Sequence, residues 1–268
     1  MKKHLLIYGL LFMSYGLHCQ DLSVISWNIE SGGAKAEGIN NSINTNWDLF
    51  KDVDVWGFSE VDAEKGWAYA IKDNLEQKSG KDFWFVVGNT GSSDRLMVVF
   101  DQDKYEMVDK YELYHINIGG SVRAPLVVQL KEKNGNKEFL FMVNHLYRTN
   151  PKARQQQAKE LSKWVQDQSL PVVAVGDYNF DYSLKPDGKK GNTSFKHFIK
   201  GDHWIWVEPA IKVMTQCNTF YNSILDFVFV NDDAAGWLAS SEVIVIPGDC
   251  PDSDETPDHR PVIAQFEF

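Results

Sequence analysis

One stretch in the middle of the chain constrains the fold most: an apolar run of strand length that ends in glycine and two polar residues. Val172 to Val175 form the run, and Gly176, Asp177 and Asn179 follow it. Continuous β-branched runs are typical of strands buried on both faces, as in parallel or mixed sheets. Ligands tend to bind where such strands end. Asp177 and Asn179 therefore either share one face of a continuing strand as part of a site or form an Asx-type turn.

Apolar or alternating segments of strand length recur along the whole chain. We expect further strands at 22–29, 53–61, 83–88, 96–100, 105–114, 126–131, 139–146, 223–230, 243–246 and 262–268. Helical spacing of apolar residues predicts helices at 40–50, 67–78, 151–168 and 195–199, with a loop at 182–192 and irregular structure at 204–211. Strands in two groups around a central helix predict one α/β (α+β) domain built from two packed sheets.

The first twenty residues have the pattern of a secretory signal. Lys2 and Lys3 precede a mostly apolar stretch, and uncharged residues lead to Asp21. The stretch is too short for a membrane span, so we expect a signal peptide at 1–20, a single catalytic domain at 21–268, and a secreted or periplasmic monomer without a membrane span or stable protein partner. Lipoprotein anchoring through Cys19 is the lesser alternative, because the preceding residues match a lipidation box poorly.

Charge and cysteine content narrow the classes of partner. The formal net charge is −10, which argues against a broad basic surface for nucleic acid or for an anionic membrane. It leaves room for a small cationic site or for a metal that supplies positive charge locally. After signal removal Cys217 and Cys250 remain. They could pair in an exported protein or stay as separate thiols, and their spacing matches no zinc motif.

Polar residues at or near the ends of the expected strands form the candidate site. They are Asn28, Glu60, His145, Asp177, Asn179, Asp226, Asp258 and His259. Carboxylate and amide oxygens suit Mg²⁺, with Mn²⁺ or Ca²⁺ as alternatives. An Asp–His pair can activate water as a general base, and a second histidine with an amide can stabilise charge on phosphoryl oxygens. This combination indicates a metal-assisted hydrolase.

Six short motifs occur in the order found in the endonuclease/exonuclease/phosphatase superfamily, and the chain resembles its deoxyribonuclease I-like members. The motifs are Ser26-Trp27-Asn28, Ser59-Glu60-Val61, Asn144-His145-Leu146, Gly176-Asp177-Tyr178-Asn179, Leu225-Asp226-Phe227-Val228 and Asp258-His259-Arg260-Pro261. The resemblance covers essentially the whole chain after the signal. It implies a four-layered sandwich of two mixed β-sheets flanked by helices, with the site between the tops of the two sheets.

The resemblance also implies which residues hold a metal and which activate water. Glu60, with Asn28 and Asp258, would bind the divalent metal. Asp226 would orient His259, and His259 would act as general base on the attacking water.

Four more residues receive catalytic roles from the same resemblance. His145, steadied by Asp94, would bond the phosphate or assist the leaving group. Asp177 and Asn179 would position the nucleophile and the phosphoryl group.

The chain departs from the nuclease pattern in its arginines and cysteines. Glu30 and Asp62 stand where the family's deoxyribonucleases place arginines that hold DNA, and the disulfide expected beside the late Asp motif is not apparent, since only Cys217 lies nearby. The candidate substrate contacts are Arg95, Arg123 and Arg148, with a solvated or structural arginine as the alternative for each. Arg154 is either a contact or part of a helix-face ion pair.

Three functions remain to be compared. The leading one is a secreted endonuclease that cleaves phosphodiesters with His/Asp-activated water, with nucleic acid as the first expected substrate. The alternative is a phosphatase or phospholipase-like phosphodiesterase on a small or lipid phosphate, which the acidic surface and the missing arginines favour. A non-catalytic binding module on the same fold is the third, and the retained histidines and carboxylates argue against it.

Overall fold

A computed structural model describes residues 21–30, 33, 35–120, 122–217, 222–250 and 256–267. The expected signal peptide at 1–20 lies outside the described residues. Within the described ranges, no helix is both long and apolar enough to cross a bilayer.

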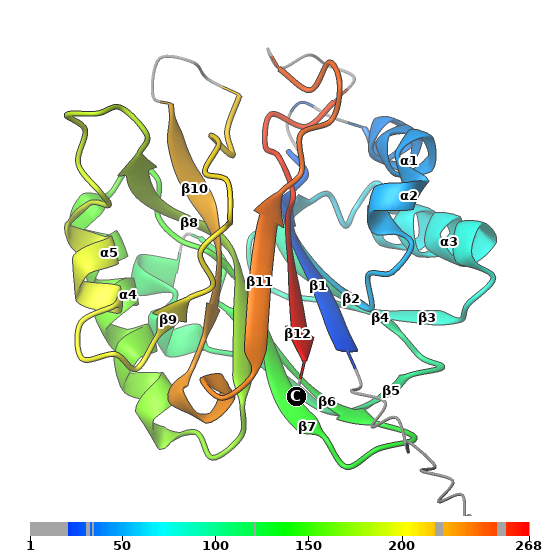
Figure 1. Cartoon of the computed structure of the whole chain (residues 1–268), viewed down its shortest axis with the longest axis horizontal. Helices are drawn as coiled ribbons and strands as arrows, with labels where there is room; N and C mark the ends of the chain where they lie inside the picture. The colour runs from blue at the N-terminus through cyan, green and yellow to red at the C-terminus, as the bar shows by residue number, and fades with distance from the viewer. Residues whose placement is uncertain are drawn as a thin grey trace, which may run out of the picture.

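Two six-stranded mixed sheets form the centre of the molecule (Figure 1). The first, in the order β11-β12-β1-β2-β4-β3, contains β1 (Asp21–Asn28), β2 (Val55–Val61), β3 (Phe83–Val87), β4 (Arg95–Asp101), β11 (Leu238–Val243) and β12 (Val262–Glu267). The second, in the order β5-β6-β7-β8-β10-β9, contains β5 (Tyr105–Glu112), β6 (Leu126–Glu132), β7 (Glu138–His145), β8 (Val172–Ser183), β9 (Ile205–Trp206) and β10 (Ser223–Val230). The expected fold class is confirmed.

Helices cover the outer face of each sheet, which gives four layers (Figure 1). Over the first sheet lie α1 (Ala36–Thr45), α2 (Trp47–Phe50) and α3 (Trp67–Ser79). Over the second lie α4 (Pro151–Trp164) and α5 (Thr193–Phe198). Single 3₁₀ turns occur at η1 (Tyr114–Ile116), η2 (Ile118–Gly120), η3 (Val165–Asp167) and η4 (Asp232–Ala234).

Each sheet contains one parallel pair, and these pairs position the site. β1 runs parallel to β2, and β7 runs parallel to β8. A parallel pair requires a crossover, which α1 and α2 provide in the first sheet and α4 provides in the second. Parallel strands end at the same edge, so Asn28 is brought next to Ser59, and His145 next to Asp177.

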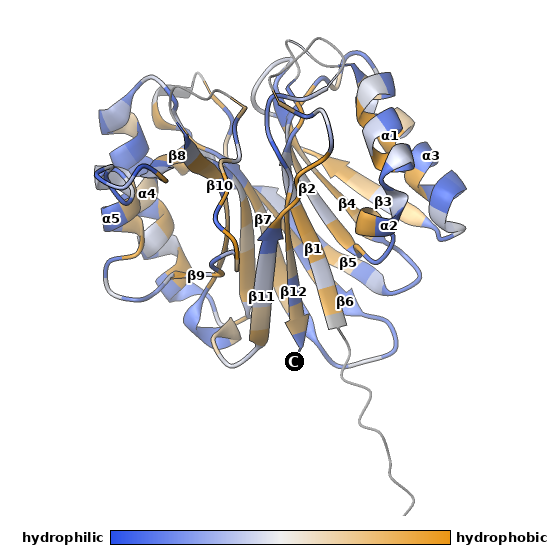
Figure 2. Cartoon of the chain, turned by 45° about the horizontal axis from the view of Figure 1, so that its top comes forward, coloured by the Kyte–Doolittle hydropathy of each residue, from blue (hydrophilic) through white to orange (hydrophobic). Residues whose placement is uncertain are grey.

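Alternation along the strands explains why both sheet faces are buried. In β1, Val24 belongs to the core between the sheets, whereas Ile25 and Trp27 belong to the core under α1–α3. A third core under α4 and α5 contains Tyr178 and Phe229. The strands accordingly contain many apolar residues, as Figure 2 shows.

Two glycines allow close approaches that a side chain would block. A Cβ at Gly57 in β2 would overlap Val175 of the facing sheet. A Cβ at Gly176 in β8 would overlap the backbone carbonyl of Asn144, and the φ of +136° at Gly176 is one that side chains disfavour. Gly176 therefore lets β8 lie against β7 directly beside the polar residues that follow.

Most expected elements are present, with corrections at some ends. The strand expected at 243–246 is wrong in position: β11 ends at Val243, and its first residues are exposed on a sheet edge, so they lack the apolar run of a buried strand. The irregular stretch at 204–211 contains the two-residue strand β9. Regular helix in the expected 151–168 segment ends at Trp164 and continues as one 3₁₀ turn.

Candidate active site

A cavity of about 530 Å³ lies where the ends of both sheets meet. Its lining residues are Glu30, Glu60, His145, Arg148, Thr149, Arg154, Asp177, Asn179, Asp181, Gln216, Ser223, Leu225, Asp258 and His259. Six of the residues expected to bind metal or catalyse are among them. Asn28 and Asp226 are buried and contact lining residues.

His259 and Asp226 form the expected pair across the two sheets. Nδ1 of His259, just before β12, lies 2.7 Å from Oδ2 of Asp226 in β10. Burial by itself lowers the pKa of His259, but the carboxylates of Asp226, Asp177 and Asp258 outweigh burial and raise it to about 10. Asp226 thus holds the proton on Nδ1 and directs Nε2 toward Asp177 and Asp258, at 4.0 and 3.8 Å.

His145 has the opposite surroundings. The guanidinium of Arg123 donates to Nδ1 of His145 at 2.6 Å. Burial, followed by the positive charges of Arg123, His259 and Arg148, lowers the pKa of His145 well below its usual range. The ring is therefore neutral, and because Nδ1 accepts, the proton is on Nε2, which lies 3.4 Å from Oδ2 of Asp177.

Arg123 also explains how Asp94 supports His145. Oδ2 of Asp94 accepts from the same guanidinium at 2.5 Å, so Asp94 acts through Arg123. Burial raises the pKa of Asp94 to about 6, against the lowering effect of Arg123. Arg123, expected as a substrate contact, is partly buried in this relay instead and is not among the residues lining the cavity in the described chain.

Asn28 contacts two of the lining carboxylates, Glu60 and Asp177. Nδ2 of Asn28 donates to Oε1 of Glu60 at 2.9 Å and lies 3.4 Å from Oδ2 of Asp177. Oδ1 of Asn28 accepts from the backbone N–H of Glu30. Asn28 therefore orients Glu60, and its own oxygen already has a donor.

The donor set fits a divalent cation. Burial, then the negative charge of Asp226, raises the pKa of Asp177, and Glu60 adds to the effect. Buried carboxylates that repel one another are stabilised by a cation, and oxygen donors suit Mg²⁺, Mn²⁺ or Ca²⁺. Glu60, Asp177 and Asp258 are the carboxylates available to hold it. Ligand atoms of Asp177, Asp226 and His259 also lie within 4.8 Å of one another.

Strained backbone presents two of these side chains. Glu60 and Asn179 have φ angles of +59° and +51°, which are uncommon for residues other than glycine. Each lies at an irregularity in strand pairing: β2 loses register with β4 between Phe58 and Val61, and β10 loses register with β8 after Ile224. Such bulges redirect side chains, here toward the cavity.

Both readings of the Asp177–Asn179 pair hold in part. β8 continues to Ser183, beyond the expected strand end. Within it, the backbone N–H of Asn179 donates to Oδ1 of Asp177 at 2.9 Å, which is the contact of an Asx turn. Nδ2 of Asn179 donates to the carbonyl of Leu146, and both side chains face the cavity.

Of the arginines expected to contact substrate, Arg148 and Arg154 line the cavity. Arg148 is exposed at its rim. Arg154 donates to the carbonyls of Tyr147 and Arg148, so it holds the turn after β7. Arg95 donates to the carbonyls of Ser92 and Gly88 and lies outside the described cavity lining.

The acidic departures from the nuclease pattern have separate positions. Glu30 lines the cavity, and its Oε2 accepts from the backbone N–H of Asp258 at 3.0 Å. Asp62 is buried and pairs with Lys65 at 2.8 Å. Sequence reasoning missed Gln216, which lines the cavity and donates to Oδ2 of Asp258 at 3.1 Å. No strand-end pattern marks it, because it lies in a loop segment.

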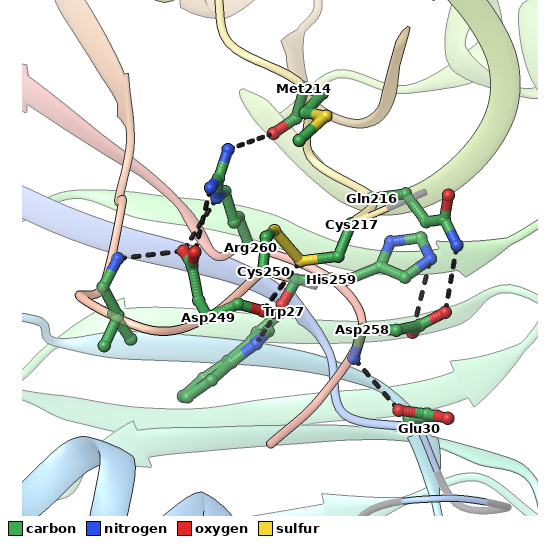
Figure 3. Close-up of a disulfide and its surroundings, with 11 residues drawn as sticks. Trp27, Glu30, Met214, Gln216, Cys217, Asp249, Cys250, Asp258, His259 and Arg260 are labelled. Atoms are coloured by element: carbon green, nitrogen blue, oxygen red, sulfur yellow. Dashed lines mark hydrogen bonds and ion pairs between the residues drawn. A yellow bond between two sulfur atoms is a disulfide. The ribbon is translucent and has the colours of Figure 1, made fainter. Parts of the chain in front are cut away.

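Cys217 and Cys250 form a disulfide (Figure 3). The apparent absence of a disulfide beside the late Asp motif is therefore wrong, because the partner of Cys217 lies 33 residues later. A pairing over that distance depends on the fold and cannot be read from local spacing.

Comparison with known proteins identifies the family to which this architecture corresponds. Residues 25–241 match the model of the Endonuclease/Exonuclease/phosphatase family. No curated protein matches the chain by sequence.

Solved structures share the fold at low sequence identity. A family protein from Bacteroides thetaiotaomicron is 17% identical, with a TM-score of 0.70 over 93% of this chain and 98% of that one. A mannosyl-6-phosphatase from the same species is 18% identical, with a TM-score of 0.69 over 92% and 100%. TDP2 from D. rerio, complexed with a single-strand DNA product, is 13% identical, with a TM-score of 0.68 over 92% and 99%. With its two packed mixed sheets and its family match over most of its length, the chain belongs to the endonuclease/exonuclease/phosphatase family.

Proposed function

We propose that the protein hydrolyses phosphoester bonds with the aid of a divalent cation, and that the two differently protonated histidines carry the reaction. The observation that supports this most directly is their opposite partners at Nδ1: a carboxylate on His259 and a guanidinium on His145. His145 is arranged to donate a proton from Nε2. His259 is arranged to accept one at Nε2 once a bound cation has offset the carboxylates that raise its pKa. Hydrolysis of a phosphoester requires both operations.

The water reaction follows from these positions. His259 takes the proton of the attacking water at Nε2, and Asp226 stabilises the imidazolium that forms. Asp177 lies within 4.0 Å of that nitrogen and within 3.4 Å of Nε2 of His145, so it lies between the two rings and can orient the water.

His145 and Asn179 act on the phosphoryl and leaving oxygens. Nε2–H of His145 donates to a phosphoryl or leaving oxygen, and the amide of Asn179, held by the carbonyl of Leu146, contributes a further N–H. Glu60, Asp177 and Asp258 would hold Mg²⁺, or Mn²⁺ or Ca²⁺. When bound, such a cation polarises a phosphoryl oxygen and offsets the carboxylate charge around His259.

For the substrate class we propose a small or lipid phosphoester in preference to duplex DNA. Carboxylates dominate the cavity lining: Glu30, Glu60, Asp177, Asp181 and Asp258 face two arginines, Arg148 and Arg154. One of those arginines is occupied by backbone carbonyls. A duplex presents many phosphates and needs several free cations along its path. A substrate with one phosphate requires few, and Arg148 with the bound cation supplies them.

Export is a further part of the proposal. The Cys217–Cys250 disulfide supports an oxidising compartment outside the cytosol. The expected secretory signal at 1–20 is consistent with that location.

A substrate panel tests the activity and its class together. The purified chain is offered plasmid DNA, RNA, phosphomonoesters and sphingomyelin, each with Mg²⁺, with Mn²⁺ or with EDTA. We expect turnover of a phosphomonoester or lipid phosphate that EDTA abolishes. Plasmid nicking that weakens steeply with salt would instead establish the endonuclease. Failure on every substrate with every metal would contradict phosphoester hydrolysis.

A further inference from the structure

A short segment before β10, Met214 to Cys217, bonds to the backbone on both sides of the His259–Asp226 pair. On one side, the N–H of Thr215 donates to the carbonyl of Ser223 at the start of β10. On the other side, Gln216 pairs in antiparallel fashion with His259. The segment therefore joins the strand that carries Asp226 to the loop that carries His259, which belong to different sheets.

Thr215 contacts both sides through different atoms. Its hydroxyl oxygen accepts from the backbone N–H groups of Leu225 and Asp226, at 2.9 and 3.2 Å. Its carbonyl accepts from the N–H of Arg260 at 2.6 Å. Thr215 is fully buried. Its hydroxyl lies at the pairing irregularity after Ile224 and accepts from N–H groups of β10 at the point where β8 contains the extra residues.

The ends of the segment are anchored on the His259 side (Figure 3). Cys217 is joined to Cys250, and its N–H donates to the carbonyl of Asp258 at 2.7 Å. Arg260 donates to the carbonyl of Met214 at 3.3 Å. The same guanidinium binds both carboxylate oxygens of Asp249, at 2.7 and 2.9 Å.

We propose that Thr215 is a positioning residue, which together with the Cys217–Cys250 disulfide sets the Asp226–His259 contact that the hydrolysis depends on. This inference rests on the proposed role of His259. Thr215 does not itself line the cavity or touch the reacting atoms, although it bonds to Ser223 and Leu225, which are lining residues. It acts by fixing the backbone of Asp226 relative to that of Arg260, and hence of the adjacent His259.

Two substitutions of nearly equal size separate positioning from simple packing. Thr215→Val removes the oxygen acceptor and keeps the shape, whereas Thr215→Ser keeps the oxygen and removes a methyl group. We expect Thr215→Val to lower kcat about 10- to 100-fold with KM changed less than about threefold, and Thr215→Ser to retain most of kcat. If the two variants lose activity equally, or if only KM changes, the positioning role is overturned.

A readout without substrate distinguishes this inference from the proposed function. In the metal-free protein, the Nδ1–H proton of His259 in its 2.7 Å contact with Asp226 should give a low-field proton NMR signal. The signal should persist in Thr215→Ser and shift or vanish in Thr215→Val. The double variant Cys217→Ser, Cys250→Ser, compared at equal folded fraction by circular dichroism, should also shift it. An unchanged signal in Thr215→Val overturns the inference even if the enzyme is active. If the signal changes in Thr215→Val but the wild type hydrolyses no substrate, the positioning role stands and the proposed hydrolase is refuted.

Discussion

The two histidines of the cavity are almost equally buried, yet their surroundings drive their pKa values in opposite directions. His145 and His259 are 5% and 7% exposed. Burial lowers the pKa of both rings. Arg123 at Nδ1 of His145 lowers it further, whereas the carboxylates around His259, led by Asp226 at Nδ1, outweigh burial and raise it. The difference teaches that burial alone does not decide the protonation of a histidine here. The sign of the neighbouring charges decides whether the effect of burial is reinforced or reversed.

The partners also come from different parts of the fold. Arg123 lies just before β6 and His145 ends β7, both strands of the second sheet, whereas Asp94 lies just before β4 of the first. His259 precedes β12 of the first sheet and meets Asp226 of the second. Each histidine is thus fixed by a network that crosses between the sheets, so the relative placement of the sheets determines both protonation states.

The largest expected effect is the loss of the base. His259→Ala removes the group that accepts the proton of water, so we expect kcat to fall about 10²- to 10⁴-fold, as for removal of a general base. Hydrolysis assays with the substrate found in the panel, with circular dichroism as the folding control, measure this. Activity within about threefold of wild type would assign the base to another residue.

Replacing the residue that contacts Nδ1 of each histidine should have the next largest effect. Asp226→Asn places an N–H donor or a neutral acceptor beside Nδ1 of His259, so the tautomer and the imidazolium are no longer favoured. Arg123→Met removes the donor to Nδ1 of His145, so its proton is no longer confined to Nε2. We expect each to lower kcat about 10- to 100-fold.

Arg95→Met is the matched control for Arg123→Met, because Arg95 is bound to backbone carbonyls and lies outside the described cavity lining. It should leave kcat within about twofold. Equal losses in Arg123→Met and Arg95→Met would show that the relay to His145 has no specific role.

The smallest effect, and the most direct test of the comparison, is on stability against pH in the metal-free protein. The pKa of His259 is raised from 6.5 to about 10, so its contribution is complete below pH 6.5 and is lost as pH rises toward 10. The pKa of His145 is lowered in the folded protein. As pH falls below 6.5, His145 therefore takes up a proton in the unfolded state before it does so in the folded state, and stability is lost.

Urea unfolding in EDTA from pH 5 to 10 measures both contributions. Relative to wild type, His259→Gln should flatten the alkaline part of the profile, and His145→Gln should flatten the acid part. Two variants that change the same part of the profile would contradict the opposite protonation of the two rings.

Local sequence was sufficient for most elements and for the residues at strand ends. The run that ends in Gly176 gave β8 and its polar pair, because hydrophobic periodicity reports burial directly. β11 was misplaced because an exposed edge strand has no apolar run, and its pairing with β12 determines its position. Short strands and loop residues such as Gln216 have no periodic signal.

The sequence by itself determined that Asn28, Glu60 and His145 lie at strand ends and that Asp177 and Asn179 follow a buried apolar run, because alternation and chain order depend only on local geometry. Only the tertiary structure decided their partners. It placed Arg123 on His145, moved Arg95 away from the cavity, and joined Cys217 to Cys250. These contacts link residues far apart in the chain, and a pKa or a disulfide depends on distances of a few ångströms that exist only once the two sheets have packed.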